Sequence, residues 1–263
     1  MFIDADKPDT FPVEIESAVV QYIMTLPQDI VKKISNYKIQ YDIDVRCFVE
    51  DYMAPFNIRT EILYADVLRI MEEYDLVCFH ATKLLSRKEV YVAGLRTNDW
   101  KRYSDMMKKT FDKVGLLSDS INEAMGFLKH EYEYKYFDKD RNAQLCFYSN
   151  LSLTSKGETA GYDQFCENIG GELARRALRD NMPQVFQLLK KNGEAVIINF
   201  LLPFFDVAYY NKDTIAYQFI CRSAAKYFWN YDYTVNFDGD TIFDVPPENI
   251  LEVIPYTEEV NYS

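Results

Sequence analysis

The stretch DLVCFHATKLL, residues 75–85, carries His80, one of only two histidines in the chain, at the end of a short apolar run. A neutral imidazole can both donate and accept a hydrogen bond, and it gains a proton close to neutral pH. His80 could therefore hold a ligand hydroxyl or act as a base. A single histidine at a strand end could equally satisfy a local hydrogen bond, and this structural alternative stays open.

Several common catalytic arrangements are excluded by what the sequence lacks. The glycine-rich patterns GxxxxGK[ST] and GxGxxG are absent, as is the GxSxG pattern of serine hydrolases. His130 lies among charged residues in KHEYEY and is expected to face solvent. Cys78 would share a strand face with His80, but a thiol two residues from its base is not a known protease arrangement. The remaining candidates are an enzyme whose reaction needs few dedicated catalytic side chains and a protein without catalytic activity.

The cysteines indicate a chain without disulfides or structural metal. Five are scattered through the sequence without a CxxC pair, and two histidines cannot complete a usual zinc set at that spacing: Cys47, Cys78, Cys146, Cys166 and Cys221. We interpret them as small buried hydrophobic residues in a reducing compartment. We expect no metal.

Composition predicts a folded, cytoplasmic protein of 263 residues with 48% hydrophobic and 27% charged residues. No apolar run approaches the roughly 20 residues that cross a bilayer, and the acidic N-terminus does not resemble a signal peptide. The net charge of −12 argues against nonspecific nucleic-acid binding. Residues 83–113 nevertheless hold nine Lys or Arg against four acids. This stretch could face an anionic ligand or form a solvated helix face.

The hydrophobic periodicity predicts an α+β fold. Apolar residues recur at helical spacing in 12–36, through Ile15, Val19 and Ile23, and in 60–74, through Ile62, Val67, Ile70 and Met71. Residues 1–73 are therefore expected to form a helical N-terminal extension, and 74–263 a second domain. Within that domain we predict a helical insertion over about 98–138, a helix after Gly171, and strands at the segments 76–80, 143–153, 193–205, 231–237 and 249–256.

Three motifs, in this order, resemble the ADP-ribosyltransferase superfamily, in particular histidine-type bacterial toxins and effectors. The first motif, FHAT followed by KEVYVAGL, is similar to the opening strand and helix of such enzymes. The second, LCFYSN, is similar to the strand that lines their nicotinamide pocket. The third, FCENIGGEL followed by a helix and AVIINFLLPF, is similar to a later segment of the bacterial members. The resemblance covers about residues 75–255. Two features depart from the family pattern: a long helical insertion, and IGGE where the family more usually has a tyrosine-led version. The assignment of Glu172 as the acidic residue therefore rests on a weaker match than the assignment of His80.

The resemblance implies a mixed β core, NAD as co-substrate and a set of site residues. Catalytic roles go to Glu172, His80 and Tyr148; cofactor-binding roles go to His80, Thr82, Gly94, Arg96, Tyr148 and Ser149. Glu167 is the reserve carboxylate. Transfer from NAD needs no covalent protein nucleophile: an aromatic ring can stack on the pyridinium, and a carboxylate can stabilise the positive charge that develops on the ribose. Arg96 could bind the diphosphate by bidentate contacts.

Each of these residues also has a structural interpretation. Tyr148 is one of 21 tyrosines and could pack in the core, and Glu172 could simply stabilise the first turn of a helix. The leading hypothesis is a mono-ADP-ribosyltransferase that modifies protein or nucleic acid, with an antitoxin or regulatory partner conceivable and no membrane partner. The alternative hypotheses are a noncatalytic protein-interaction module on the same fold and, third, a nucleic-acid binder.

Overall fold

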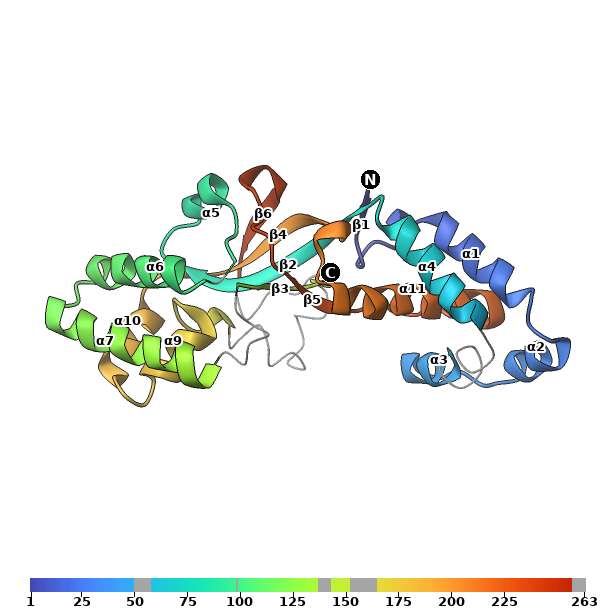
Figure 1. The fold of residues 1–263 in the computed structure, drawn as a ribbon, viewed down its shortest axis with the longest axis horizontal. Helices are drawn as coiled ribbons and strands as arrows, with labels where there is room; N and C mark the ends of the chain where they lie inside the picture. The colour runs from blue at the N-terminus through green and yellow to red at the C-terminus, as the bar shows by residue number, and fades with distance from the viewer. Residues whose placement is uncertain (50–57, 98, 137–142, 152–164, 257–263) are drawn as a thin grey trace. The chain divides into compact units, whose positions relative to one another are not determined.

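The protein has an α+β fold built on one six-stranded sheet, seen in Figure 1. The computed structural model describes residues 1–49, 58–97, 99–136, 143–151 and 165–256. Its chain forms two compact units: unit 1 comprises 1–77 and 202–239, and unit 2 comprises 78–201 and 240–263. Unit 1 thus contains the N-terminal helices together with residues 202–239, which lie within the range 74–263 predicted for the second domain.

The strands follow the order β5-β3-β2-β4-β6, and the sixth strand, β1, pairs with β2 outside this linear order. β1 is parallel to β2, whereas β3 is antiparallel to β2 and β6 is antiparallel to β4. The strand bounds are Phe2–Ile3 for β1, Asp75–Leu84 for β2, Leu145–Tyr148 for β3, Glu194–Pro203 for β4, Asp238–Thr241 for β5 and Ile250–Pro255 for β6. β4 reads as an almost continuous apolar run because both of its faces are covered: the consecutive residues Val196, Ile197 and Ile198 are fully buried.

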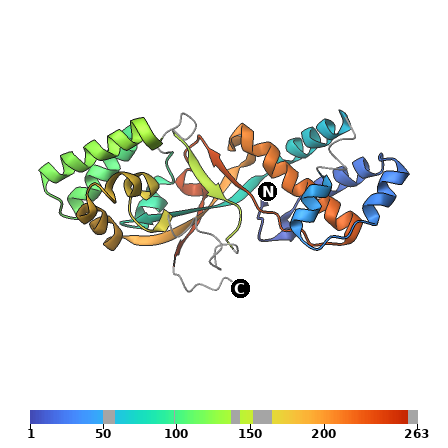
Figure 2. The same cartoon turned by 90° about the horizontal axis from the view of Figure 1, so that it is seen from below.

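Unit 2 buries its main helical core among four helices. The described helices of this unit are α5 (Lys88–Ala93), α6 (Trp100–Lys113), α7 (Ser118–Glu131), η4 (Tyr132–Tyr136), α9 (Gly171–Leu178), α10 (Pro183–Lys191) and η7 (Pro247–Asn249). Met107 and Phe111 of α6, Leu128 of α7 and Leu173 of α9 belong to one buried cluster. Figures 1 and 2 show α7 and α9 lying side by side. The expected insertion is therefore two amphipathic helices whose apolar faces are covered by α9 and α10.

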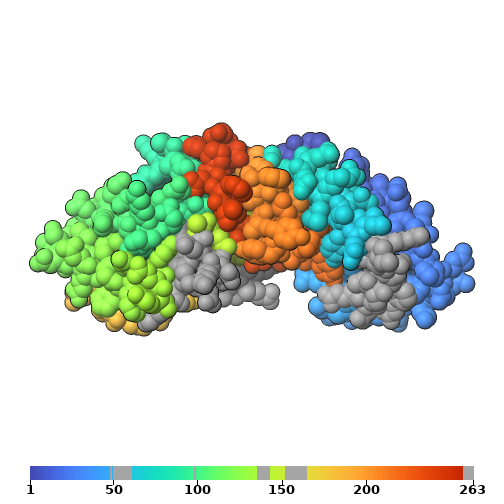
Figure 3. Space-filling view, viewed as in Figure 1, coloured from blue at the N-terminus to red at the C-terminus, as the bar shows by residue number. Residues whose placement is uncertain are grey.

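The outer edge of the sheet in unit 2 is protected by α5. β6 is the last strand of the order, and the Val253 backbone amide donates a 3.0 Å hydrogen bond to the Tyr91 hydroxyl of α5. Two residues further along β6, Pro255 has no backbone N–H to offer. In Figure 3 the surface of β6, in red, adjoins that of α5, in green. Tyr91 and Pro255 together make this edge a poor template for another strand.

Unit 1 packs α1, α4 and α11 against one another, as Figures 1 and 2 show. Its described helices are η1 (Pro8–Thr10), α1 (Val13–Ile23), α2 (Gln28–Ser35), α3 (Asp42–Phe48), α4 (Ile58–Met71), η6 (Phe204–Asp206) and α11 (Tyr209–Trp229). The stripe Ile15, Val19 and Ile23 is buried as its spacing predicts. A buried Tyr233 hydroxyl accepts from Arg46 Nε at 2.9 Å and donates to Gln218 at 2.8 Å, so the polar groups of this core are also paired.

Three details of the sequence prediction are wrong. The helix expected over 12–36 breaks before Pro27, since a proline disfavours helical backbone at the residue before it. In α4 the buried stripe runs through Leu63, Val67 and Met71, whereas Ile62 is 57% exposed. The segment 231–237 alternates buried and exposed residues as expected, yet it forms no ladder and is not a strand.

Gly94 closes α5 in a conformation that other residues adopt only under strain. Its φ is +71°, and its amide donates to the Val90 carbonyl at 2.8 Å. A Cβ at this position would lie 2.0 Å from the Val245 carbonyl oxygen. The next residue, Leu95, exchanges two 2.9 Å backbone hydrogen bonds with Val245. Gly94 is therefore required by backbone geometry, whatever role it has toward a ligand.

Gly94→Ala should lower the free energy of unfolding by on the order of 2–3 kcal/mol, since backbone strain and a steric clash add. Gly115→Ala is the matched control, because Gly115 also has a positive φ (+79°) but has nothing within 4 Å of a Cβ. Denaturant unfolding of both variants measures the difference. Equal losses would show that the approach of Val245 is unimportant.

Candidate functional site

His80 lies in β2 and is half-buried, with Nδ1 2.9 Å from the Cys146 carbonyl oxygen of the neighbouring β3. A carbonyl can only accept, so Nδ1 carries the proton in this contact. Burial lowers the pKa of His80 below its ordinary value, and the hydrogen bond to Cys146 opposes that effect only in part. His80 is therefore a neutral imidazole at pH 7, fixed in one tautomer with Nε2 as its acceptor nitrogen.

The strand register sets the side of the sheet on which each candidate lies. Phe79 pairs directly with Tyr148, and paired residues project from the same face. Neighbouring residues along a strand project from opposite faces, so His80 points away from the face that Tyr148 occupies. The structure brings the two residues to adjacent positions of paired strands but on opposite faces.

The segment that precedes α9 is anchored to both of these strands. The Cys166 thiol lies 3.6 Å from the Thr82 carbonyl oxygen, and Lys83 Nζ donates to the Lys190 carbonyl at the end of α10. Tyr148 packs on Phe165, with ring centroids 6.3 Å apart. Tyr148 thus has an aromatic partner within the protein. The motif around residues 165–172 lies against the strands that carry the other two motifs.

Both candidate carboxylates are ion-paired. Glu172 stands in the first turn of α9, is 15% exposed, and lies 2.6 Å from Arg176 one helical turn later. Glu167 lies 2.9 Å from Lys190. Gly170 precedes the helix in the left-handed conformation, and its carbonyl accepts from the Tyr103 hydroxyl at 2.9 Å. The amino end of α9 favours an acid at Glu172.

Of the remaining predicted cofactor-binding residues, Ser149 and Gly94 have roles within the protein itself. Ser149 is fully buried and its hydroxyl donates to the Asn150 side chain. Thr82 is half-buried and, two residues after His80, shares its face of β2. Gly94 is buried under Val245, as described above.

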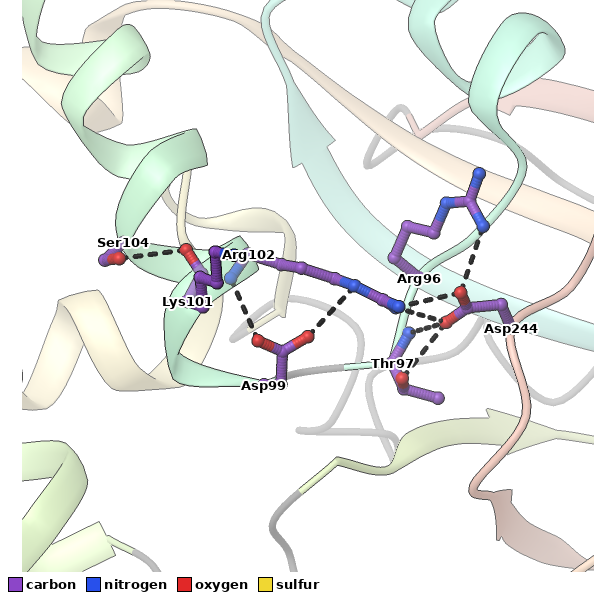
Figure 4. A network of polar contacts seen from close by, with 7 residues as sticks. All are labelled: Arg96, Thr97, Asp99, Lys101, Arg102, Ser104 and Asp244. Atoms are coloured by element: carbon purple, nitrogen blue, oxygen red, sulfur yellow. Dashed lines mark hydrogen bonds and ion pairs between the residues drawn. The ribbon is translucent and has the colours of Figure 1, made fainter.

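Arg96 belongs to a polar network centred on Asp244, a residue that was not among the predicted site residues (Figure 4). Its Nη1 donates to Asp244 at 3.0 Å, and Arg102 Nη1 lies 2.8 Å from both oxygens of the same carboxylate. The Thr97 amide and hydroxyl also donate to Asp244, at 2.9 and 3.0 Å. Burial works against the ionised form of Asp244, but the hydrogen bonds from Thr97 and Arg96 outweigh it and hold the pKa of Asp244 below its ordinary value.

Cysteines, metals and membranes add no further site. Cys78, Cys166 and Cys221 are buried, as expected, but Cys47 and Cys146 are exposed, so that prediction is wrong for two of the five. Among the described residues no group of three or more His, Cys, Asp or Glu could hold a metal ion. Within the same residues every helix is too short or too polar to cross a bilayer.

Comparison with protein-family models, with curated proteins and with solved structures finds no significant match to this chain.

His80→Asn should remove a pH dependence of stability. Asn Nδ2 and His Nδ1 are both attached to Cγ, so the variant keeps a donor for Cys146 but cannot titrate. Because the folded pKa of His80 is lowered, the unfolded chain binds the proton first as the pH falls below about 6.5. Wild type should then lose up to about 1.4 kcal/mol of stability per pH unit relative to the variant, until the folded pKa is reached. Parallel unfolding curves between pH 7 and pH 5 would contradict the assignment.

Proposed function

We propose that this chain is an NAD-dependent mono-ADP-ribosyltransferase that modifies a macromolecular acceptor. The observation that carries the proposal is the anchoring of the segment 165–172 to both β2 and β3, through Cys166 with Thr82 and through Phe165 with Tyr148. Three motifs separated by up to 92 positions, from His80 to Glu172, thereby belong to one region of unit 2.

The proposed reaction breaks the bond between nicotinamide and the ribose carbon. Nicotinamide leaves with the electron pair, the acceptor attacks the same carbon, and the acceptor loses a proton to solvent. His80 holds the substrate: with Nδ1–H donated to Cys146, Nε2 can accept a hydrogen bond from a ribose hydroxyl. Accepting this hydrogen bond requires a neutral imidazole, which burial of His80 favours.

Glu172 supplies the negative charge that the transition state needs. Its carboxylate is only 15% exposed, so its field is less screened than that of a surface acid. Positive charge develops on the ribose only as nicotinamide leaves, so a fixed carboxylate stabilises the transition state more than bound NAD. The pair with Arg176 orients Glu172, and Glu167 remains the reserve carboxylate.

The resemblance also suggests the biological setting, a toxin, defence or effector protein acting in the cytoplasm. Protein and nucleic acid are both retained as acceptor classes. The net charge of −12 favours a protein acceptor, while the basic stretch 83–113 favours nucleic acid.

A noncatalytic protein-interaction module is the second candidate, and a specific observation favours it. His80 and Tyr148 project from opposite faces of the sheet, so one small pocket cannot be lined by both side chains. Tyr148 packs on Phe165, as a core aromatic would. On this alternative the chain neither consumes NAD nor gains thermal stability from it.

Glu172→Gln should lower the rate of transfer by on the order of a hundredfold with little change in NAD affinity, since only the transition-state charge is lost. Arg176→Gln is the matched control, because it breaks the same ion pair but leaves the carboxylate. His80→Ala should weaken NAD binding as well. Single-turnover rates and NAD titrations separate these defects. Equal rates for Glu172→Gln and wild type would pass the role to Glu167, tested by Glu167→Gln.

Incubation of the chain with adenylate-labelled NAD and a whole-cell lysate tests activity and acceptor class together. Protein and nucleic acid are then separated and counted, with Glu172→Gln as the inactive reference. Label in either fraction supports the transferase and identifies the acceptor class. Absence of label and of NAD consumption, in a chain that remains folded, would leave the noncatalytic module as the better account.

A further inference from the structure

The donors around Asp244 have the composition of a phosphate site. One backbone amide, one hydroxyl and two guanidinium groups converge on its two oxygens, all at 2.8–3.0 Å. Backbone N–H groups, hydroxyls and arginines are the donors that proteins use to bind phosphate oxygens. Figure 4 shows Arg96 and Arg102 reaching the carboxylate from two directions, with Thr97 on a third side.

The site is open to a ligand from solvent. The side chains of Arg96 and Arg102 are 52% and 53% exposed, whereas Asp244 is 24% exposed. Arg102 is also oriented by Asp99, which lies 3.0 Å from its Nε and caps α6. The two guanidiniums are thus held in place by the protein but are only partly desolvated, so an anion can approach them without unfolding unit 2.

A simple arginine–carboxylate pair elsewhere in unit 2 differs from the Asp244 network in its set of donors. Arg87 makes a bidentate pair with Glu194, one guanidinium to one carboxylate, with no hydroxyl or amide joining them among the contacts of the described residues. Asp244 instead receives two arginines and two neutral donors. A carboxylate has two oxygens for these donors, and a diphosphate offers more oxygens and more charge.

We propose that Arg96, Arg102 and Thr97 form a diphosphate-binding site that Asp244 occupies in the ligand-free chain. Asp244 acts as an internal competitor, because the ligand enters by displacing its carboxylate. The apparent affinity equals the intrinsic affinity multiplied by the fraction of time that the carboxylate is out of the site. That the site takes a phosphate group rests on the donor set; that this group belongs to a diphosphate, the one in NAD, rests on the proposed function.

Binding of inorganic pyrophosphate, measured by calorimetry at constant ionic strength, tests the proposal. Asp244→Asn keeps an oxygen acceptor for Thr97 but removes the competing charge, so pyrophosphate should bind about tenfold more tightly than to wild type. Adding Arg96→Gln or Arg102→Gln to that variant should weaken binding by about tenfold or more. Glu194→Gln and Arg87→Gln are the matched controls and should change pyrophosphate binding by less than twofold.

Each outcome decides the proposal. Tightening in Asp244→Asn, absent in Glu194→Gln, supports it; equal affinity in wild type and Asp244→Asn overturns it, as does binding that survives both arginine replacements. Should Asp244→Asn unfold, the arginine Nε–H signals of the wild-type chain are followed by NMR during a pyrophosphate titration. A shift of the Arg102 signal without a shift of the Arg87 signal supports the site, and the absence of a selective shift overturns it.

The pyrophosphate experiment requires no transfer reaction. A chain that binds pyrophosphate at this site but never transfers ADP-ribose would overturn the proposed function alone. A chain that transfers ADP-ribose but shows no effect of Asp244→Asn on pyrophosphate would overturn only the diphosphate site.

Discussion

The alternation of side chains along β2 is the constraint on which the arrangement of unit 2 depends. Its odd-numbered residues share the face of Tyr148, and its even-numbered residues share the face of His80. Lys83 reaches the end of α10 from one face, while His80 binds the Cys146 carbonyl from the other. A shift of one residue in the β2–β3 pairing would exchange the two sets, so the register decides which candidates can meet.

Much of the fold could be read from periodicity, because burial on one face leaves a pattern in the sequence. α6, α7, β4 and β6 lie where the sequence predicts them, α1 lies in the first half of the range 12–36, and β2 extends the predicted strand to Leu84. α11 was not predicted, because its buried residues include the adjacent pair Ile215–Ala216 and the run 218–221, so no narrow apolar stripe marks it. At 231–237 the alternation predicted the burial of Tyr233, Val235 and Phe237, but not the absence of a hydrogen-bonding partner strand.

The site was less predictable than the fold, because its contacts join residues that are distant in sequence. Asp244 lies 148 positions after Arg96, and nothing in the chain near either residue indicates the other. Glu172 and Arg176 are an exception, since a spacing of four on a helix predicts their pair. Gly94 illustrates a different limit: a glycine after a helix predicts a turn, but the approach of Val245 that forbids a side chain depends on tertiary structure.

Ion pairing and strand faces constrain a ligand to very different degrees. Partly exposed ion pairs are worth about 0–1 kcal/mol, so the partners of Arg96 and Glu167 can be replaced by ligand groups at small cost, whereas Glu172 is only 15% exposed and its pair with Arg176 is less screened. The strand faces cannot be exchanged without breaking the sheet. A dinucleotide that binds His80 therefore approaches the face of the sheet opposite to Tyr148. In that arrangement Tyr148 has a packing role, through its contact with Phe165. Strand alternation puts Phe147 of β3 on the face of His80, but its ring is fully buried in the core and has no surface on which a ligand ring could stack.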